Sequence, residues 1–222
     1  MLSKRLMAIA DLVDDGSNII DIGCDHALID IYLTLNRHVK CIATDISKSS
    51  IKVSHDNVEK YDLSDQITLI QTDGLSGINI DNIDTAIISG MGTSTILKIL
   101  KGYKFNNLII QSNNNLKSLR FEIIKKGYVI TNEEIVYEKG RYYIIIKFCL
   151  GRKKYRYIDY FIGPIIRLNK RKMDRNYIQH LLNVYKVMLS KTPKKKIVER
   201  LFLNYKIYLL TSIKWKMLGH HH

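Results

Sequence analysis

Acidic side chains stand on both sides of a single glycine near the start of the chain. Asp21 precedes Gly23, and Asp25 and His26 follow it. A dinucleotide-binding turn would carry several glycines and hold a pyrophosphate, which these carboxylates would repel. The residue types therefore favour a cationic ligand without phosphates, such as S-adenosylmethionine. Asp21 and the turn backbone would hold its amino-acid end, although Asp21 alone would equally fit a strand-end residue bonded to local backbone.

Two further acids end apolar segments downstream. Asp45 closes the apolar run 39–45, about 20 residues beyond the glycine, a spacing that suits an acid accepting hydrogen bonds from ribose hydroxyls. Asp73 follows the run 66–71 and precedes Gly74. In the same interpretation, Asp73 would contact the edge of an adenine.

Short apolar runs alternate with helical patterns along residues 1–150. Runs typical of strands occupy residues 18–22, 39–45, 66–71, 84–89 and 107–112. Apolar residues at helical spacing occupy residues 2–13, 27–36, 46–62, 93–100 and 116–126, with Ser47 as an N-cap. Two β-rich segments, 128–136 and 141–150, flank a turn. This order predicts an α/β fold of five strand–helix units and a terminal hairpin, with a seven-stranded, mostly parallel sheet.

Ligands of open α/β sheets bind at the carboxyl ends of the strands. Five such ends carry acids, glycines or amides in this chain: Gly23 with Asp25, Asp45, Asp73 with Gly74, Gly90 with Met91 and Gly92, and Gln111 with Asn113. Each of these residues could serve a local turn. Together they predict a ligand site at this edge of the sheet.

The positive charge of the chain is concentrated in its last third. The 222 residues carry a net charge of +14. Residues 1–150 contain 17 Lys and Arg and 18 Asp and Glu, whereas residues 151–222 contain 18 and 3. A solvated surface usually mixes signs, so this imbalance favours a polyanionic partner, with an anionic membrane surface as the weaker alternative. We expect two domains, 1–151 and 152–218, with residues 219–222 as the remnant of a tag.

The C-terminal domain has the pattern of a helical hairpin. Gly163 and Pro164 mark a helix start. Apolar residues then recur at three- and four-residue spacing on both sides of a break at 191–194: Ile178, Leu181, Tyr185 and Met188, then Val198, Leu201, Tyr205 and Tyr208. The pattern predicts an all-α antiparallel hairpin with coiled-coil-like packing. We expect its aromatic residues in the core rather than on a base-stacking surface.

Cysteine usage and hydropathy limit the remaining classes. Cys24, Cys41 and Cys149 are widely spaced and form no CxxC pair, so neither a zinc site nor a disulfide framework is expected. No apolar run is long enough to cross a membrane, and residues 1–13 lack the pattern of a signal peptide. We expect a cytoplasmic monomer that binds neither a membrane nor a metal.

Three motifs together resemble one bacterial family. Residues 21–27 (DIGCDHA), 89–92 (SGMG) and 111–113 (QSN) are similar to those of the tRNA (adenine-22-N1)-methyltransferase family (TrmK). The resemblance covers nearly the whole chain, including residues 2–6, 138–140 and 163–164. The chain departs from the family at three places. Residues 28–30 read Leu-Ile-Asp where the family usually has Tyr-Leu-Pro, Thr93 replaces a common glycine, and Ser112 replaces a common proline.

The resemblance implies a Rossmann-like class I methyltransferase domain followed by a coiled-coil domain. It implies transfer of a methyl group from S-adenosylmethionine to N1 of adenine 22 in the D arm of tRNA. The cofactor would be held by residues at the strand ends: Asp21, Gly23, Asp25, Asp45, Asp73, Gly74, Gly90, Met91 and Gly92. Candidates near the reacting methyl are Asp25, His26 and Asn113, although His26 would equally fit a helix-start residue. Candidates for tRNA contacts are Lys4, Arg5, Gln111, Lys194, Lys195 and Lys196.

Three other functions share parts of this pattern. A nicotinamide-dependent oxidoreductase has the same fold class, but the single glycine and the flanking acids disfavour it. A non-catalytic RNA-binding protein could retain a cofactor domain, although the intact set of strand-end residues disfavours this alternative. A methyltransferase acting on another RNA adenine would carry the same motifs, and the sequence does not separate it from the family's activity.

Overall fold

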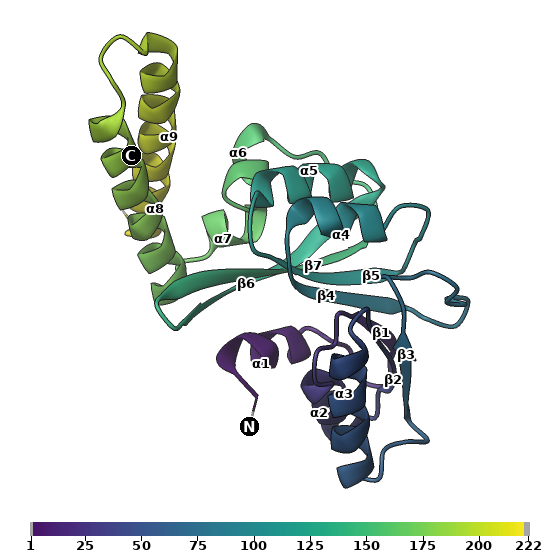
Figure 1. The fold of residues 1–222 in the computed structure, drawn as a ribbon. Coiled ribbons are helices and arrows are strands. Elements are labelled where there is room, and N and C mark those ends of the chain that lie inside the picture. Colours follow the sequence, from purple (N-terminus) through teal and green to yellow (C-terminus); the bar gives the residue numbers. More distant parts are fainter. Residues whose placement is uncertain (1, 220–222) are drawn as a thin grey trace. The chain divides into compact units, whose positions relative to one another are not determined.

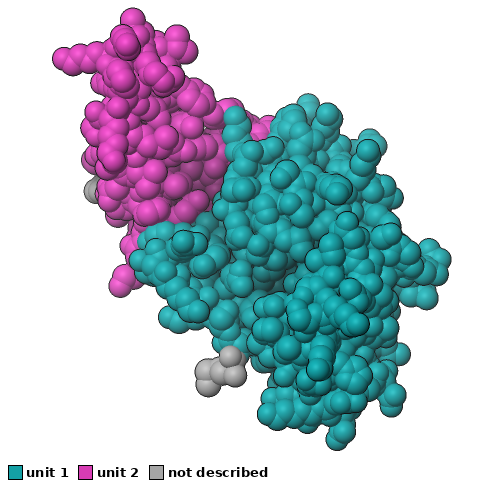
Figure 2. Space-filling model, in the orientation of Figure 1, with its two compact units in different colours: residues 1–154 teal, residues 155–222 magenta. Residues whose placement is uncertain are grey.

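The computed structural model describes residues 2–219 and divides the chain into two compact units, residues 1–154 and 155–222 (Figure 2). This division falls within the basic segment that follows the last strand, close to the predicted domain boundary. The functional division at 151/152 stays a prediction. Of the predicted tag, residues 220–222 lie outside the described residues. Within residues 2–219, no helix combines the length and the apolar character needed to span a bilayer.

The first unit is built on one seven-stranded sheet. Its strands are β1 (Asn18–Ile22), β2 (Lys40–Asp45), β3 (Ile67–Gln71), β4 (Thr85–Met91), β5 (Asn107–Ser112), β6 (Tyr128–Glu138) and β7 (Arg141–Leu150). They lie in the order β3-β2-β1-β4-β5-β7-β6. Neighbours among β1 to β5 are parallel, and β7 is antiparallel to both β5 and β6. The predicted Rossmann-like sheet with a terminal hairpin is confirmed.

Helices cover both faces of this sheet. They are α1 (Lys4–Ala10), α2 (Leu28–Arg37), α3 (Lys48–Lys60), α4 (Thr93–Ile99) and α5 (Leu116–Lys125). In Figure 1, α1, α2 and α3 lie on one face, and α4 and α5 lie on the other. The prediction of five strand–helix units was wrong at one point, because residues 72–84 after β3 form turns rather than a helix. Gly74 and Gly77 adopt positive φ angles there, which favours turns.

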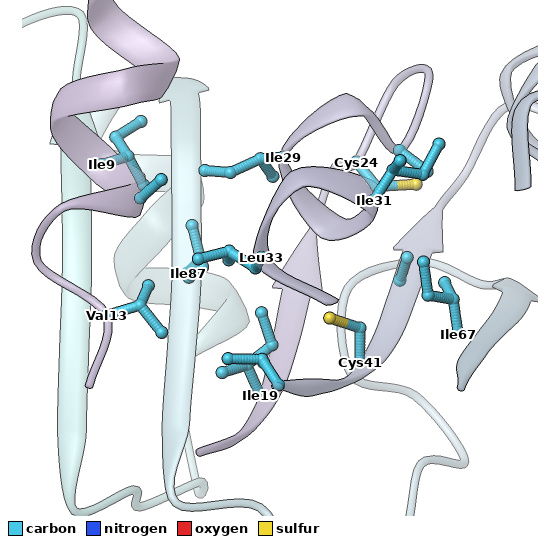
Figure 3. Packing of buried hydrophobic residues seen from close by; sticks show 14 of the residues in the cluster. Ile9, Val13, Ile19, Cys24, Ile29, Ile31, Leu33, Cys41, Ile67 and Ile87 are labelled. Carbon is cyan, nitrogen blue, oxygen red and sulfur yellow. The ribbon is translucent and has the colours of Figure 1, made fainter. Parts of the chain in front are cut away.

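The core of the first unit surrounds β1, the middle one of the five parallel strands. Ile19, Ile20 and Ile22 are at most 1% exposed. On one face of the sheet, Ile19 belongs to a cluster with Ile9 and Val13 at and after α1, Leu33 of α2 and Ile87 of β4 (Figure 3). Burying an aliphatic side chain of this size stabilises a fold by about 1.5–3 kcal/mol. Asp21, the acid near the carboxyl end of β1, is buried as well.

The second unit is helical in its described part. Its helices are α6 (Tyr157–Phe161), α7 (Pro164–Leu168), α8 (Lys172–Lys191) and α9 (Ile197–Met217). Pro164 is the first residue of α7, as predicted. A short basic turn joins α8 to α9, and the two helices pack side by side (Figure 1). The predicted helical hairpin is confirmed.

The predicted register of α9 was wrong. Val198, Leu201, Tyr205 and Tyr208, the expected contact row, are 80%, 63%, 49% and 69% exposed. The buried positions form a different row with the same spacing: Leu203, Leu210, Ile213 and Met217. Apolar residues occupy nearly every side of this helix, so periodicity alone does not select the buried row. Tyr205 and Tyr208 therefore lie at the surface rather than in the core.

A buried ion pair links α5 to β6. Arg120 Nε donates to Glu133 Oε1 at 2.8 Å, and the two side chains are 1% and 0% exposed. Desolvating two charges is expensive, so the pair is a weak source of net stability. Removing one partner is costly, however, because the remaining charge stays buried without its counter-ion.

Glu133→Ala should lower the free energy of unfolding by about 3–5 kcal/mol, because it removes the carboxylate that the buried Arg120 guanidinium contacts. Urea unfolding followed by circular dichroism measures this loss. The matched control is Glu199→Ala, which breaks the exposed Lys196–Glu199 pair and should change stability by less than about 1 kcal/mol. Equal losses in the two variants would contradict the role given to burial.

Candidate active site

The loop between β1 and α2 has an unusual backbone. Gly23, Asp25 and Ala27 all adopt positive φ angles, of 84°, 56° and 53°. The amides of Gly23 and Cys24 both donate to the Thr44 carbonyl at the end of β2, at 2.8 and 3.0 Å. A Cβ atom on Gly23 would lie 2.5 Å from the Met91 side chain. Glycine is therefore favoured by its φ, and a larger residue would also have to displace the end of the Met91 side chain.

Asp45 ties this loop to the end of β2. Its carboxylate accepts hydrogen bonds from the backbone amides of Asp25, at 3.2 Å, and Ser47, at 2.8 Å. Ser54 of α3 donates to the Asp25 carbonyl at 3.0 Å. Each carboxylate oxygen keeps a further lone pair. Asp45 therefore fixes the loop and still has lone pairs available. Its hydrogen bond with a ligand hydroxyl stays a prediction.

A cavity of about 210 Å³ lies at the carboxyl ends of β1 and β4, beneath α1. Its lining includes six of the predicted site residues: Arg5, Asp21, Gly23, Asp25, His26 and Gly90. The remaining lining residues are Leu6, Ile9, Cys24, Leu28, Ile29, Ile87 and Ser89. The cavity is thus mostly apolar on the side of α1 and α2, apart from Arg5, and acidic at the end of β1.

Electrostatics in this cavity favour a cation over an anion. Asp21 is 4% exposed, and burial together with the neighbouring Asp30 and Asp45 raises its pKa well above its usual value. Burial and the same acids also raise the pKa of the Cys24 thiol, so this cysteine is neutral and a poor nucleophile. Asp25 and His26 at the rim lie 3.7 Å apart and are well exposed. A positively charged ligand group would relieve the repulsion among these acids.

Gln111 connects the end of β5 to this cavity. Its Oε1 accepts from Arg5 Nη1 at 3.0 Å and from the Gly90 amide at 3.1 Å. Its Nε2 donates to Asn113 Oδ1 at 3.1 Å, and Asn113 Nδ2 donates to the Gly90 carbonyl at 2.6 Å. Arg5 also lies over the Tyr143 ring, 5.3 Å from its centroid. Gln111 is 1% exposed, so it orders Arg5 and Asn113 from within.

Thr93 and Ser112, which both differ from the family pattern, lie next to each other. Thr93 Oγ1 and Ser112 Oγ lie 2.9 Å apart, and each lies within hydrogen-bond distance of the Asn114 carbonyl, at 2.7 and 2.9 Å, so one of them donates to the carbonyl and the other to its neighbouring hydroxyl or to the same carbonyl. The Thr93 amide donates to Asn114 Oδ1 at 3.0 Å. Together these bonds join the start of α4 to the end of β5. The two hydroxyls therefore support the loop that follows β5 rather than alter the cavity.

Other predicted residues lie outside the cavity lining. Asp73 and Gly74 follow β3, where Asp73 is exposed. Gly92 is the N-cap of α4, and the Lys4 amide donates to Glu138 on β6. The predicted tRNA contacts Lys194, Lys195 and Lys196 lie in the second unit, between α8 and α9. The roles of all these residues stay predictions.

Sequence reasoning did not single out several lining residues. Ser89 directly precedes the Gly-Met-Gly motif, so its place at the end of β4 could have been inferred. Leu28 and Ile29 begin α2, and their apolar character signalled only helix packing. Asp30 stands at a position where the chain departs from the family pattern, so the sequence marked it as unusual. Only the structure shows that it is fully buried.

One group on α3 has the residue types of a metal site. Ligand atoms of His55, Asp56 and Glu59 lie within 4.8 Å of one another, and all three residues are exposed. His55 and Glu59 form a helical i,i+4 pair at 3.5 Å, which accounts for their approach. His55 and Glu59 therefore form a surface pair on α3, and none of the three residues lines the cavity.

Comparisons with known proteins agree with this architecture. Residues 2–146 match the model of the methyltransferase domain family. The chain is 30% identical, over 83% of its length and 84% of the relative's, to the tRNA (adenine(22)-N(1))-methyltransferase of Bacillus subtilis. The structure of M. capricolum TrmK in complex with S-adenosyl-homocysteine is 30% identical, with a TM-score of 0.85 over 96% of this chain and 97% of that one. The B. subtilis TrmK structure is 25% identical, with a TM-score of 0.84 over 96% and 99%. The chain therefore belongs to the tRNA (adenine-22-N1)-methyltransferase family.

Proposed function

We propose that this chain transfers a methyl group from S-adenosylmethionine to N1 of adenine 22 in the D arm of tRNA. The observation that carries this proposal is the acidic cavity at the carboxyl ends of β1 and β4. It lies in a chain similar over most of its length to an enzyme named for this reaction. A related structure contains S-adenosyl-homocysteine, which is the product left after the methyl is donated.

The residues of the cavity fit this cofactor. Asp21 is a buried acid at the wall, suited to the ammonium of an amino-acid end. Gly23 brings the loop backbone against the end of the Met91 side chain and takes a positive φ, which suits close approach of a ligand to the backbone. Asp45 would accept hydrogen bonds from the ribose hydroxyls, and Gly90, Met91 and Gly92 at the end of β4 would contribute backbone contacts. Asp73 and Gly74 complete the proposed set on the adenine side. When bound, S-adenosylmethionine supplies a methyl activated by its sulfonium.

Methyl transfer to adenine N1 depends on alignment of the reacting groups more than on proton transfer. Adenine N1 already carries a lone pair in the base plane, so no strong general base is needed. Asn113 is held by Gln111 and by the Gly90 carbonyl, so its amide is fixed near the cavity. Such positioning of the reacting groups is a large source of rate enhancement. The Asp25 carboxylate at the rim would stabilise the positive charge that develops on the adenine, and His26 beside it is a further candidate near the reacting methyl.

The target nitrogen lies on the pairing edge of its base. The base must therefore leave the stack or come from a distorted tRNA. Recognition then depends on tRNA shape and phosphates, which suits the basic second unit. Lys194, Lys195 and Lys196 are all exposed in the turn between α8 and α9. Lys4 and Arg5 are further candidates in the first unit.

The second unit also contains a pocket with the residue types of a nucleotide contact. The pocket measures about 360 Å³ and is lined by Arg156, Arg167 and Lys216 together with Tyr157 and Tyr205. Cations suit phosphates, and tyrosine rings suit the faces of bases. Tyr205 is 49% exposed, so its ring is accessible. We propose this pocket as part of the tRNA contact surface.

The remaining proposals concern where and how the protein works. We propose a monomer acting in the cytoplasm, where tRNA is its partner. Free thiols at Cys24, Cys41 and Cys149 support a reducing compartment. The oligomeric state can be read from sedimentation at micromolar concentration, where a mass near 25.8 kDa is expected.

Transfer of radiolabelled methyl to unmodified tRNA transcripts tests the proposed reaction. A transcript with adenine at position 22 should be labelled, and one with guanine there should not. Label on both transcripts would support methyltransferase activity but reject adenine 22 as the target. Label on neither, with tRNA still bound, would favour a non-catalytic RNA-binding protein.

Asp25→Ala and Asn113→Ala should each lower kcat by roughly a hundredfold or more, because both remove polar groups that we propose to lie near the reacting base. Single-turnover methyl transfer measures the loss, and circular dichroism checks the fold. Asp81→Ala, an exposed acid in the turns after β3, is the matched control and should behave like the parent chain. Near-normal rates in both test variants would reject the assignment.

Replacing Lys194, Lys195 and Lys196 by Gln should weaken tRNA binding for all sequences alike. The slope of log K against log salt should become shallower by about 2–3, since each phosphate contact contributes roughly 0.7–0.9. The matched control replaces Lys48, Lys52 and Lys60 of α3, which are equally exposed but lie in the first unit. A slope that changes equally in both triple variants, or in neither, would show that the hairpin turn does not contact tRNA.

A further inference from the structure

Arg5 brings a positive charge to a cavity whose other polar residues are mainly acids. It lies in the first turn of α1, is half-buried, and shares the lining with Asp21 and Asp25. A guanidinium beside carboxylates commonly pairs with one of them. Within residues 2–219, however, Arg5 makes one hydrogen bond and one ring contact, and no ion pair. Its charge is therefore available to a ligand that enters the cavity.

Two contacts fix the guanidinium without exhausting its donors. Arg5 Nη1 donates to Gln111 Oε1 at 3.0 Å, and Arg5 Cζ lies 5.3 Å from the centroid of the Tyr143 ring. Gln111 is 1% exposed and also accepts from the Gly90 amide, so the anchor is itself buried and bonded. A guanidinium carries N–H donors on each of its nitrogens, and in the described part of the chain only the Nη1 group is engaged. Arg5 thus keeps donors for a further acceptor.

The guanidinium lies against the backbone at the end of β4. A Cβ atom on Gly90 would be 3.6 Å from Arg5 Nη1. Strand β4 pairs with β1, where Asp21 stands opposite Ile87. Arg5 at the end of one strand and Asp21 near the end of its neighbour therefore present a basic and an acidic group to the same cavity.

This combination of groups matches an α-amino acid. Such a ligand end carries an ammonium and a carboxylate on the same carbon, so its site needs an acid and a cation that are not paired with each other. Asp21 is the acid, and the guanidinium of Arg5 suits a carboxylate through parallel N–H bonds. The lining residues Leu6, Ile9 and Ile29 are apolar, which strengthens both interactions.

We propose that the guanidinium of Arg5 binds the carboxylate of the amino-acid end of S-adenosylmethionine. This proposal rests on the proposed function, since it takes S-adenosylmethionine as the ligand of this cavity. Gln111 is then a positioning residue, because it holds Arg5 from a buried position. With the ammonium at Asp21, the site recognises both charges of the amino-acid end.

A guanidinium matches a carboxylate of the cofactor and a phosphate of the tRNA equally well in shape. The surroundings of Arg5 favour the carboxylate. A phosphate would approach Asp21 and Asp25 without a positive group of its own, whereas the amino-acid end brings its ammonium with it. Separate measurements of cofactor and tRNA affinity distinguish these two sources of the anion.

Calorimetric titration with two ligands that differ only in the carboxylate tests this role. S-adenosyl-homocysteine carries both groups of the amino-acid end. Its decarboxylated analogue, 5′-(3-aminopropylthio)-5′-deoxyadenosine, keeps the ammonium alone. The full chain should bind S-adenosyl-homocysteine about 10- to 100-fold more tightly than the analogue, as expected for hydrogen bonds between charged groups.

Arg5→Gln should abolish this preference. It should weaken binding of S-adenosyl-homocysteine by about 10- to 100-fold and leave binding of the analogue within about threefold of the parent. Arg5→Lys keeps the charge without the fork of N–H groups, so its preference should lie between the two. The matched control is Arg141→Gln, an exposed arginine of β7 outside the cavity lining, which should bind both ligands like the parent.

An equal affinity of the parent chain for both ligands would overturn the role of Arg5, whether or not the variants fold. A preference for S-adenosyl-homocysteine that is unchanged in Arg5→Gln would overturn it as well. Loss of tRNA affinity in Arg5→Gln, with S-adenosyl-homocysteine bound as in the parent, would assign Arg5 to a phosphate instead. If neither ligand binds at millimolar concentration, the proposed cofactor is wrong, and this role fails with it.

Discussion

The parallel pairing of β1 with both β2 and β4 is the constraint on which the rest of the first unit depends. It places β1 at the middle of the five parallel strands, with α2 and α3 on one face of the sheet and α4 and α5 on the other (Figure 1). The strand is covered on both sides and must be apolar. Its polar chemistry is confined to the carboxyl end, where Asp21 is buried at the wall of the cavity. A buried acid at this point is expensive for the fold, and a cationic ligand recovers part of that cost.

The loops at this edge are held by many small interactions rather than by one strong bond. Gly23 bonds to the end of β2 and lies against Met91 of β4, while Asp45 receives the amide of Asp25. On the other side, Gln111 orders Arg5, Gly90 and Asn113 from a fully buried position. Groups from β1, β2, β4 and β5 are thus placed before any ligand arrives. Such preorganisation is the contribution that a methyl transfer to a ready lone pair needs most.

The sequence predicted the strands well because each is a short apolar run that ends in an acid, a glycine or an amide. It predicted Gly23 and the cavity residues Asp21, Asp25 and Gly90 for the same reason. The count of five strand–helix units was one too many, because only turns follow β3. The sequence also did not predict the buried row of α9, because apolar residues surround that helix and several registers look alike. The pairing of Thr93 with Ser112 and the burial of Asp30 arise from tertiary contacts. No local pattern contains that information.

The central claim is that the cavity at the ends of β1 and β4 holds S-adenosylmethionine by its amino-acid end. The most direct measurement is a crystal structure of the chain with S-adenosyl-homocysteine. We expect the ammonium within hydrogen-bond distance of Asp21, the amino-acid end along the Gly23 loop, and the ribose hydroxyls at Asp45. S-adenosyl-homocysteine bound elsewhere, with this cavity filled by side chains or water in an enzyme that still transfers methyl groups, would contradict the account.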